Sequence, residues 1–187
     1  TVSQNVVTAG NGTIDLRATK VGAGFINLNN ASLQSGTNGA GAGTVQLIAS
    51  GDIKTSTANG TVNEIQTTGN ALLVSGGAIG ADGKRIETSG VAILAAKSAG
   101  AQWLRQSSGD LTVGSVTALT PGDNALDNTA ASQAGLTTSV GDAAINLNVA
   151  AGNLTVSQNV VTAGNGTIDL RASKVNDGFI NLNGASL

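Results

Sequence analysis

Few side chains in this sequence could do chemistry, and those that could are acidic or basic. Asp52, Asp82 and Asp110 are the candidate carboxylates, and Lys84–Arg85 is the candidate basic pair. Paired carboxylates serve acid/base hydrolysis or bind Ca²⁺. Asp52 and Asp110, however, each follow a glycine and open or continue a predicted strand, where a corner aspartate caps the backbone. We therefore interpret these acids as structural and expect no catalytic site.

Cofactor chemistry is equally sparse. The sequence contains no cysteine and no histidine, which excludes disulfides, zinc–thiolate sites, Cys–His pairs and Ser–His–Asp triads in this stretch. The calcium-binding nonapeptide GGxGxDxUx is absent, because residues 76–82 read GGAIGAD. We expect no cofactor, with structural calcium as the one alternative left open.

Composition limits the partners. Charged residues make up 11% of the chain, the net charge is −2 and the nine basic residues are scattered, so we expect no nucleic-acid partner. No apolar run is long enough to span a bilayer. Trp103, in AQWLRQ, could stack on a sugar or contact a partner if exposed; otherwise it covers the core. Trp103, Lys84 and Arg85 are the candidate surface contacts.

The strongest feature is a long internal repeat. Residues 1–33 return as residues 155–187, at an offset of 154, with 29 of 33 positions identical. The differing pairs are Thr19/Ser173, Gly22/Asn176, Ala23/Asp177 and Asn30/Gly184. The chain therefore divides into one repeat unit, residues 1–154, and the start of the next copy, residues 155–187. Both ends fall inside the pattern, so we expect a window of a longer repetitive polypeptide.

Within the repeat, six-residue stretches alternate apolar and small polar residues, as in residues 13–18, 44–49 and 144–149, which is the signal of a β-strand. Corners rich in Asn and Gly separate them. An antiparallel sandwich and a parallel β-helix both fit this pattern. The scarcity of aromatic residues, the 12-to-20-residue spacing and the near-exact repeat favour a right-handed parallel β-helix.

The inward positions of that β-helix are predicted from the alternation. At about 20 residues per three-sided coil, the repeat unit would hold about seven or eight coils. A low-β-propensity run, residues 117–142, is predicted to leave the coil as a loop, with a short helix around residues 124–134. The predicted core residues are Ile14, Leu16, Ile26, Leu28, Val45, Leu47, Ile145 and Leu147.

Four segments carry a family resemblance: GTVQLIASGDIKTS, GTIDLRATK, DAAINLNVAAGNLTVSQNVVTAG and GDLTVGSVTAL. This recurring pattern resembles the repeat region of filamentous-haemagglutinin-like large exoproteins, exported by two-partner secretion or as autotransporters. The resemblance covers most of the chain outside residues 117–142. It implies a right-handed parallel β-helical shaft at the bacterial cell surface, outside the cell. It does not name a ligand.

These observations predict a non-enzymatic, structural or adhesive segment of a giant extracellular fibre. The expected partners are further copies of itself, joined covalently or by end-to-end or lateral association, and a glycan or protein on a host or neighbouring cell. One alternative is a self-assembling extracellular filament subunit. Another is a pectate-lyase-like enzyme acting on polysaccharide through Asp82 and Lys84.

The inward assignment can be tested with the two copies of one leucine. Leu16→Asp and its counterpart Leu170→Asp are each expected to open the coil, because an unpaired carboxylate would be forced into apolar surroundings. Circular dichroism and thermal melting measure the effect. Unchanged β signal and melting temperature would contradict the assignment.

Overall fold

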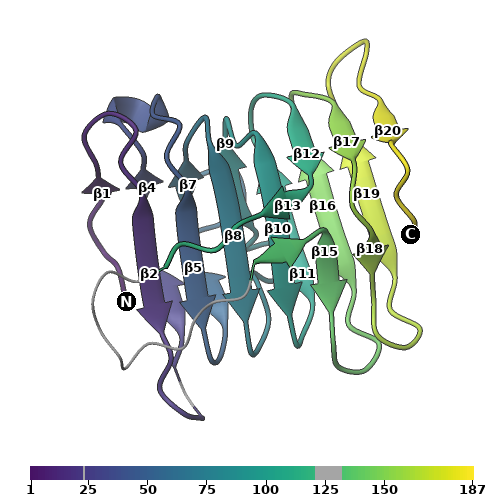
Figure 1. Ribbon diagram of the computed structural model, residues 1–187, viewed down its shortest axis with the longest axis horizontal. Coiled ribbons are helices and arrows are strands. Elements are labelled where there is room, and N and C mark those ends of the chain that lie inside the picture. Colours follow the sequence, from purple (N-terminus) through teal and green to yellow (C-terminus); the bar gives the residue numbers. More distant parts are fainter. Residues whose placement is uncertain (23, 121–131) are drawn as a thin grey trace.

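The computed structural model describes residues 1–22, 24–120 and 132–187. Within these residues the chain is built of short β-strands, with a single 3₁₀ turn, η1 (Thr37–Gly39). Figure 1 shows the strands stacked side by side in two layers, from the N-terminus at one end to the C-terminus at the other. The molecule is therefore a solenoid in which each turn lies on the one before it.

The two layers are here named face A and face B. Face A contains the seven-stranded sheet and the short β3–β6 pair, which is linked to it by bridges through Ile79. Its strands are β1 (Val6–Val7), β3 (Ile26–Leu28), β4 (Leu33–Gln34), β6 (Ile53–Thr55), β7 (Ile65–Gln66), β9 (Ile86–Ser89), β11 (Gln102–Gln106), β16 (Ile145–Val149) and β19 (Ile168–Ala172).

Face B is the nine-stranded sheet. In it β12 and β15 share one row, and so do β17 and β18. Its strands are β2 (Ile14–Ala18), β5 (Val45–Ala49), β8 (Asn70–Ser75), β10 (Ile93–Ser98), β12 (Leu111–Val113), β15 (Leu136–Thr138), β17 (Leu154–Val156), β18 (Val160–Val161) and β20 (Ile180–Leu182).

Strand pairing settles the topology that the alternation left open. Every pair within the two faces is parallel, and β13 (Ser115–Val116) with β14 (Gln133–Ala134) is the antiparallel pair of the described strands. In Figure 1 the strands of face B run downward in front, those of face A run upward behind, and the chain advances from left to right. The fold is the expected right-handed parallel β-solenoid.

The turns are longer and fewer than predicted from the sequence. Strand partners on successive turns lie 18 to 32 residues apart, and 40 or 43 across residues 115–134, as at Ile86–Leu104, Leu33–Ile65 and Gln102–Ile145. From Val2 the chain returns to face A at Ile26, Ile53, Ile79, Gln102 and Ile145 before it reaches Val156 on face B. The repeat unit therefore spans five and a half turns, because long corners connect its strands.

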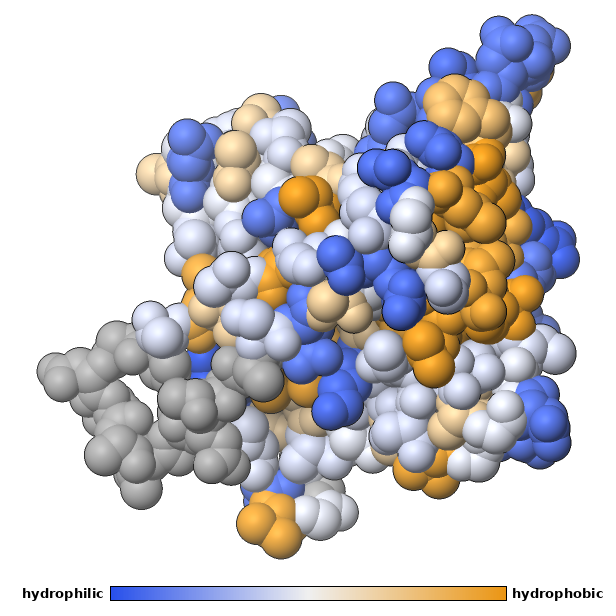
Figure 2. Space-filling model, turned by 45° about the vertical axis from the view of Figure 1, so that its right-hand side comes forward, coloured by the Kyte–Doolittle hydropathy of each residue, from blue (hydrophilic) through white to orange (hydrophobic). Residues whose placement is uncertain are grey.

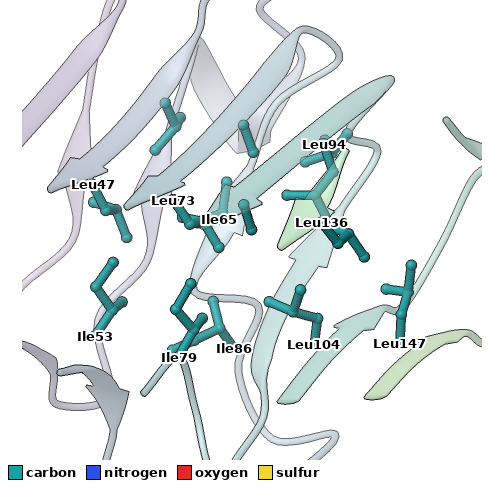
Figure 3. Close-up of a cluster of buried hydrophobic side chains, with 14 of the residues drawn as sticks. Leu47, Ile53, Ile65, Leu73, Ile79, Ile86, Leu94, Leu104, Leu136 and Leu147 are labelled. Carbon is teal, nitrogen blue, oxygen red and sulfur yellow. The ribbon is translucent and has the colours of Figure 1, made fainter. Parts of the chain in front are cut away.

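The core is a set of aliphatic stacks between the two faces (Figure 3). Leu47 stacks on Leu73, and Leu104 on Leu147, because parallel pairing in register places inward residues above one another. Leu16, in contrast, is half-buried because β2 pairs on one side alone. The other predicted core positions are buried: Ile14, Ile26, Leu28, Val45, Leu47, Ile145 and Leu147.

Residues 115–134, here named the excursion, interrupt one row of face B. Strands β13 and β14 form its base, and β15 has already rejoined face B within the predicted loop of residues 117–142. The predicted helix around residues 124–134 lies largely outside the described residues, and its end is strand β14. Three residues, Leu136–Thr138, are too short a run to be recognised from alternation.

Two stacked leucines should respond differently to truncation. Leu47→Ala is expected to lower the free energy of unfolding by about 3 kcal/mol, because its strand β5 is paired on both sides and the cavity is enclosed. Leu16→Ala, one turn earlier in the same stack, should cost less than half as much, because its site can collapse towards solvent. Urea unfolding midpoints measure both. Equal losses would contradict the observed difference in burial.

Candidate interaction surfaces

Trp103 lies on the outer side of face A, because buried and half-buried side chains alternate along β11. The Arg85 guanidinium carbon lies 5.3 Å from the centroid of its ring, as in a cation–π contact. Arg85 Nη1 also donates to Asn146 Oδ1 at 2.5 Å and to the Leu104 carbonyl at 3.3 Å. The tryptophan is therefore fixed in place, with a cation above its ring.

The second basic candidate, Lys84, belongs to a tight turn beside this contact. The backbones of Ala81 and Lys84 exchange two hydrogen bonds of 2.9 and 3.0 Å around Gly83, whose φ is +72°. The Lys84 side chain is exposed. Burial lowers the pKa of Arg85, and the nearby Asp82 carboxylate partly offsets this. Of the two predicted basic contacts, the structure brings Arg85 onto the Trp103 ring.

Glu64 and Glu87 are buried carboxylates on successive turns of face A, with 1% and 2% of their surfaces exposed. The backbone N–H of Glu87 donates to Glu64 Oε2 at 2.8 Å. Glu64 Oε1 lies 2.7 Å from the hydroxyls of both Thr55 and Thr57. Arg105 Nη1 pairs with Glu87 Oε2 at 2.7 Å. This network ties the corner that precedes β7 to β9 and β11.

Burial raises the pKa of Glu64, because the charged form loses solvation in the protein interior. Hydrogen bonds from the Thr55 and Thr57 hydroxyls, and from the backbone N–H of Glu87, oppose this rise by stabilising the carboxylate. The folded protein therefore binds a proton at Glu64 more readily than the unfolded chain does, and the stability of the fold depends on pH at this position.

A second polar chain follows the outer side of face A towards the C-terminal end. Asn146 Nδ2 donates to Asp169 Oδ2 at 3.1 Å, and Arg171 Nη2 pairs with the same atom at 2.7 Å. The hydrogen bond from Arg171 lowers the pKa of Asp169. In the first copy, Asp15 and Arg17 form the same pair at 2.9 Å. The Arg171–Asp169 pair is exposed and contributes little stability, whereas the Arg17–Asp15 pair is largely covered.

The three candidate acids lie on different turns. Asp52 Oδ1 accepts the backbone N–H of Ala78 at 2.9 Å, and Asp110 Oδ1 accepts that of Asn153 at 2.8 Å. Both are therefore corner aspartates that bind the backbone of the following turn, whereas Asp82 lies in the tight turn beside Lys84. In the described parts of the chain, no three Asp, Glu, His or Cys residues are grouped to hold a metal ion.

Two glutamines occupy inward positions among the aliphatic stacks. Gln102 Nε2 donates to the Thr137 carbonyl at 2.8 Å, and its Oε1 is buried without a hydrogen-bond partner in the described residues. Gln106 Nε2 donates to the Val91 carbonyl at 2.9 Å, and its Oε1 accepts from the Thr88 hydroxyl. These side chains fill the ends of β11, where inward positions meet backbone carbonyls of the corners.

The outer side of face B carries a second, smaller hydrophobic cluster. Leu72 of β8, Ala95 of β10 and Val116 of β13 are buried together. Half-buried Val74, Ile93 and Ala118 pack around them. Val116 and Ala118, at the start of the excursion, therefore lie on the outside of face B and remove its apolar centre from water.

Polar side chains fasten the excursion further along the face. The fully buried Gln46 accepts the Leu119 N–H at 2.8 Å through Oε1 and directs Nε2 to Asp15 Oδ1 at 2.9 Å. Arg17 Nη2 donates to the Leu119 carbonyl at 2.9 Å. Residues 102 positions apart in the chain thus meet on the outside of face B.

Sequence reasoning missed the buried carboxylate Glu64 and the covered outer side of face B. A single Glu before a strand carries no signal of burial. The covered outer side of face B could have been recognised from the sequence, because residues 71–74 and 93–96 are unbroken apolar runs. Such runs are typical of parallel strands buried on both sides. Such runs require a cover on their outer side, which the alternation of the other strands does not indicate.

The pH dependence of Glu64 can be isolated with Glu64→Gln. Because its pKa is raised in the folded state, Glu64 supports stability below its ordinary value of 4.5, and this contribution is lost as the pH rises through the folded pKa. Glu64→Gln does not titrate. Its melting temperature should therefore fall less than that of the wild type between pH 4 and pH 8, as measured by thermal melts; parallel curves would contradict the role of burial.

Comparisons with known proteins add no identity to this geometry. The chain matches no family model, no curated protein and no solved structure. No helix in the described ranges has the length and apolar character needed to cross a membrane. What can be stated of the chain is its architecture, an all-β solenoid with two parallel faces.

Proposed function

We propose that this chain is a segment of the stiff β-solenoid shaft of an extracellular bacterial surface fibre of the adhesin type. The observation that carries the proposal is that both copies of the repeat stack on the following turn in the same register. Val2 pairs with Leu28, and its copy Val156 pairs with Leu182. A sequence that stacks identically wherever it occurs suits a shaft lengthened by adding copies.

Backbone clamps repeat along with the strands. The Ser32 N–H donates to Asn5 Oδ1 at 2.9 Å, and in the second copy the Ser186 N–H donates to Asn159 Oδ1 at 3.0 Å. None of the four substitutions between the copies falls on these clamps or on an inward aliphatic residue. The repeated information is thus the information needed to stack one turn on another, which supports a structural role.

The C-terminal turn has the surface that a further turn would cover. Figure 2 shows a band of hydrophobic side chains on this end of the molecule. The residues exposed there include Val161, Phe179, Ile180, Leu182 and Leu187, with 42–59% of their surfaces open. In the first copy, Ile26 and Leu33 pair with Ile53 and Ile65 of the next turn. A following stretch equivalent to residues 34–66 would cover the C-terminal turn in the same way.

The adhesive part of the proposal rests on the form of the molecule. A stiff array of identical units multiplies weak contacts, so that low-affinity surface groups bind through avidity. The groups most suited to such contacts are on the outer side of face A, around Trp103 and Arg85. In this function the chain acts by spanning distance and presenting surfaces.

A self-assembling filament subunit is the second candidate. Both ends of the solenoid favour it, because β2 and β20 each pair on one side alone and unpaired strand edges direct association. Covalent continuation and subunit stacking differ in the mass of the denatured fibre. On a denaturing gel, a single band of very high mass supports the covalent shaft. A band near the 18.1 kDa of this chain supports the subunit.

The shaft proposal predicts how length grows with copy number. Each added copy of residues 1–154 should lengthen the particle by about 26 Å, because five and a half turns stack at about 4.8 Å each. Small-angle X-ray scattering of chains with one, two and three copies measures this. Antibody labelling of intact cells tests the surface location. Copies that form separate globules, or an antigen confined to the cell interior, would contradict the proposal.

A further inference from the structure

Equivalent strands of the two copies of the repeat lie on opposite faces of the solenoid. Strand β2 belongs to face B, where it pairs with β5. Its copy β19, which has the same sequence, belongs to face A, where it pairs with β16. Figure 1 shows the consequence directly, because the turn after β2 lies at the bottom of the molecule and the turn after β19 lies at the top.

The exchange follows from the number of crossings in one repeat. From β2 the chain alternates between the faces until it reaches β19. The segments after β2 begin at Ile26, Val45, Ile53, Asn70, Ile79, Ile93, Gln102, Leu111, Ile145, Leu154 and Ile168. These are eleven crossings, and an odd number moves every residue to the other face after one repeat.

The register in which two turns stack does not depend on the face that a strand occupies. Val156–Leu182 on face B keeps the register of Val2–Leu28 on face A, so stacking depends on the adjoining turn and not on the side of the solenoid. In solenoids each turn contacts its neighbours only. A further copy would therefore continue the same alternation and exchange the faces again.

We infer that successive repeats of the shaft present the excursion on opposite sides of the fibre. This inference rests on the proposed function, because it requires at least two complete copies in one shaft. In the repeat described, the base of the excursion, β13 and β14, lies outside face B against Leu72 and Ala95. In the next repeat the equivalents of Leu72 and Ala95 lie on face A, and the base of the excursion packs against that side.

The Trp103–Arg85 contact exchanges sides in the same way. It lies on face A in the first repeat, opposite the side that the excursion covers. Along each side of the fibre, two kinds of patch therefore alternate. One is the base of the excursion over its apolar cluster, and the other is the polar patch that contains Trp103 and Arg85. A given surface recurs on one side every two repeats, about 53 Å apart at about 4.8 Å per turn. A partner that binds one of these patches would decorate both sides of the fibre.

Distances between spin labels test the inference, because the chain has no cysteine and introduced cysteines are unique. The test chain is residues 1–154 followed directly by the full 187-residue sequence, with Thr117→Cys in both repeats; Thr117 is exposed at the base of the excursion. Labels on opposite sides should be about 40 Å apart by double electron–electron resonance, because two sheets with their outer layers, at about 10 Å per spacing, add about 30 Å at right angles to the axial advance of about 26 Å. Labels on the same side would be about 26 Å apart, the axial advance of one repeat.

A control in the 187-residue chain tests the observed exchange itself. Lys20→Cys and Lys174→Cys mark the same exposed position in the two copies. They should also lie about 40 Å apart, and about 26 Å would overturn the half-turn offset. If this control holds while the Thr117 pair gives about 26 Å, the inference is wrong. If the two-repeat chain fails to lengthen in scattering, the shaft proposal fails instead, and the Lys20–Lys174 distance still reports on the offset.

Discussion

Parallel stacking of each turn on the one before it is the interaction on which the structure depends. A parallel ladder satisfies backbone groups of one turn with those of the next, and it places inward residues directly above one another. Aliphatic side chains of similar size then form continuous stacks, such as Leu16, Leu47 and Leu73. Local sequence, strand register and core packing agree at every turn, which is why a nearly unchanged repeat folds in two settings.

Corners impose the second constraint, because they leave backbone N–H groups outside the ladder. Asn and Asp side chains meet this need by accepting an N–H from the following turn. Asn5, Asn11, Asp52, Asp110 and Asn159 all do so. A residue type that is usually associated with turns thus also holds one turn to the next. The same geometry explains why Asp52 and Asp110 lie at separate corners, each bound to the backbone of the following turn.

The sequence predicted the fold class and most inward positions, because both follow from alternation and from the internal repeat. It did not predict the number of turns, since corners such as residues 56–64 add length without a periodic signal. The hydrogen bond from the Glu87 N–H reaches the buried Glu64 only after the next turn has stacked, so no local pattern predicts it. The docking of Leu119 on Gln46 and Arg17 is likewise a long-range contact that no local pattern encodes. The resemblance to large exoproteins supplied a function that remains a proposal.

The unequal spacing of the turns has a mechanical consequence. The ladder hydrogen bonds of a solenoid run along its axis, so tension between its ends pulls turns apart in sequence, each released turn adding slack. With about 3.4 Å per extended residue, the 18-residue turn at Thr88–Gln106 releases about 60 Å, and the 43-residue turn at Asp110–Asn153 releases about 150 Å. A fibre of such repeats would absorb a sudden load through extensions of different lengths. The turn that contains the excursion would release the greatest length of chain.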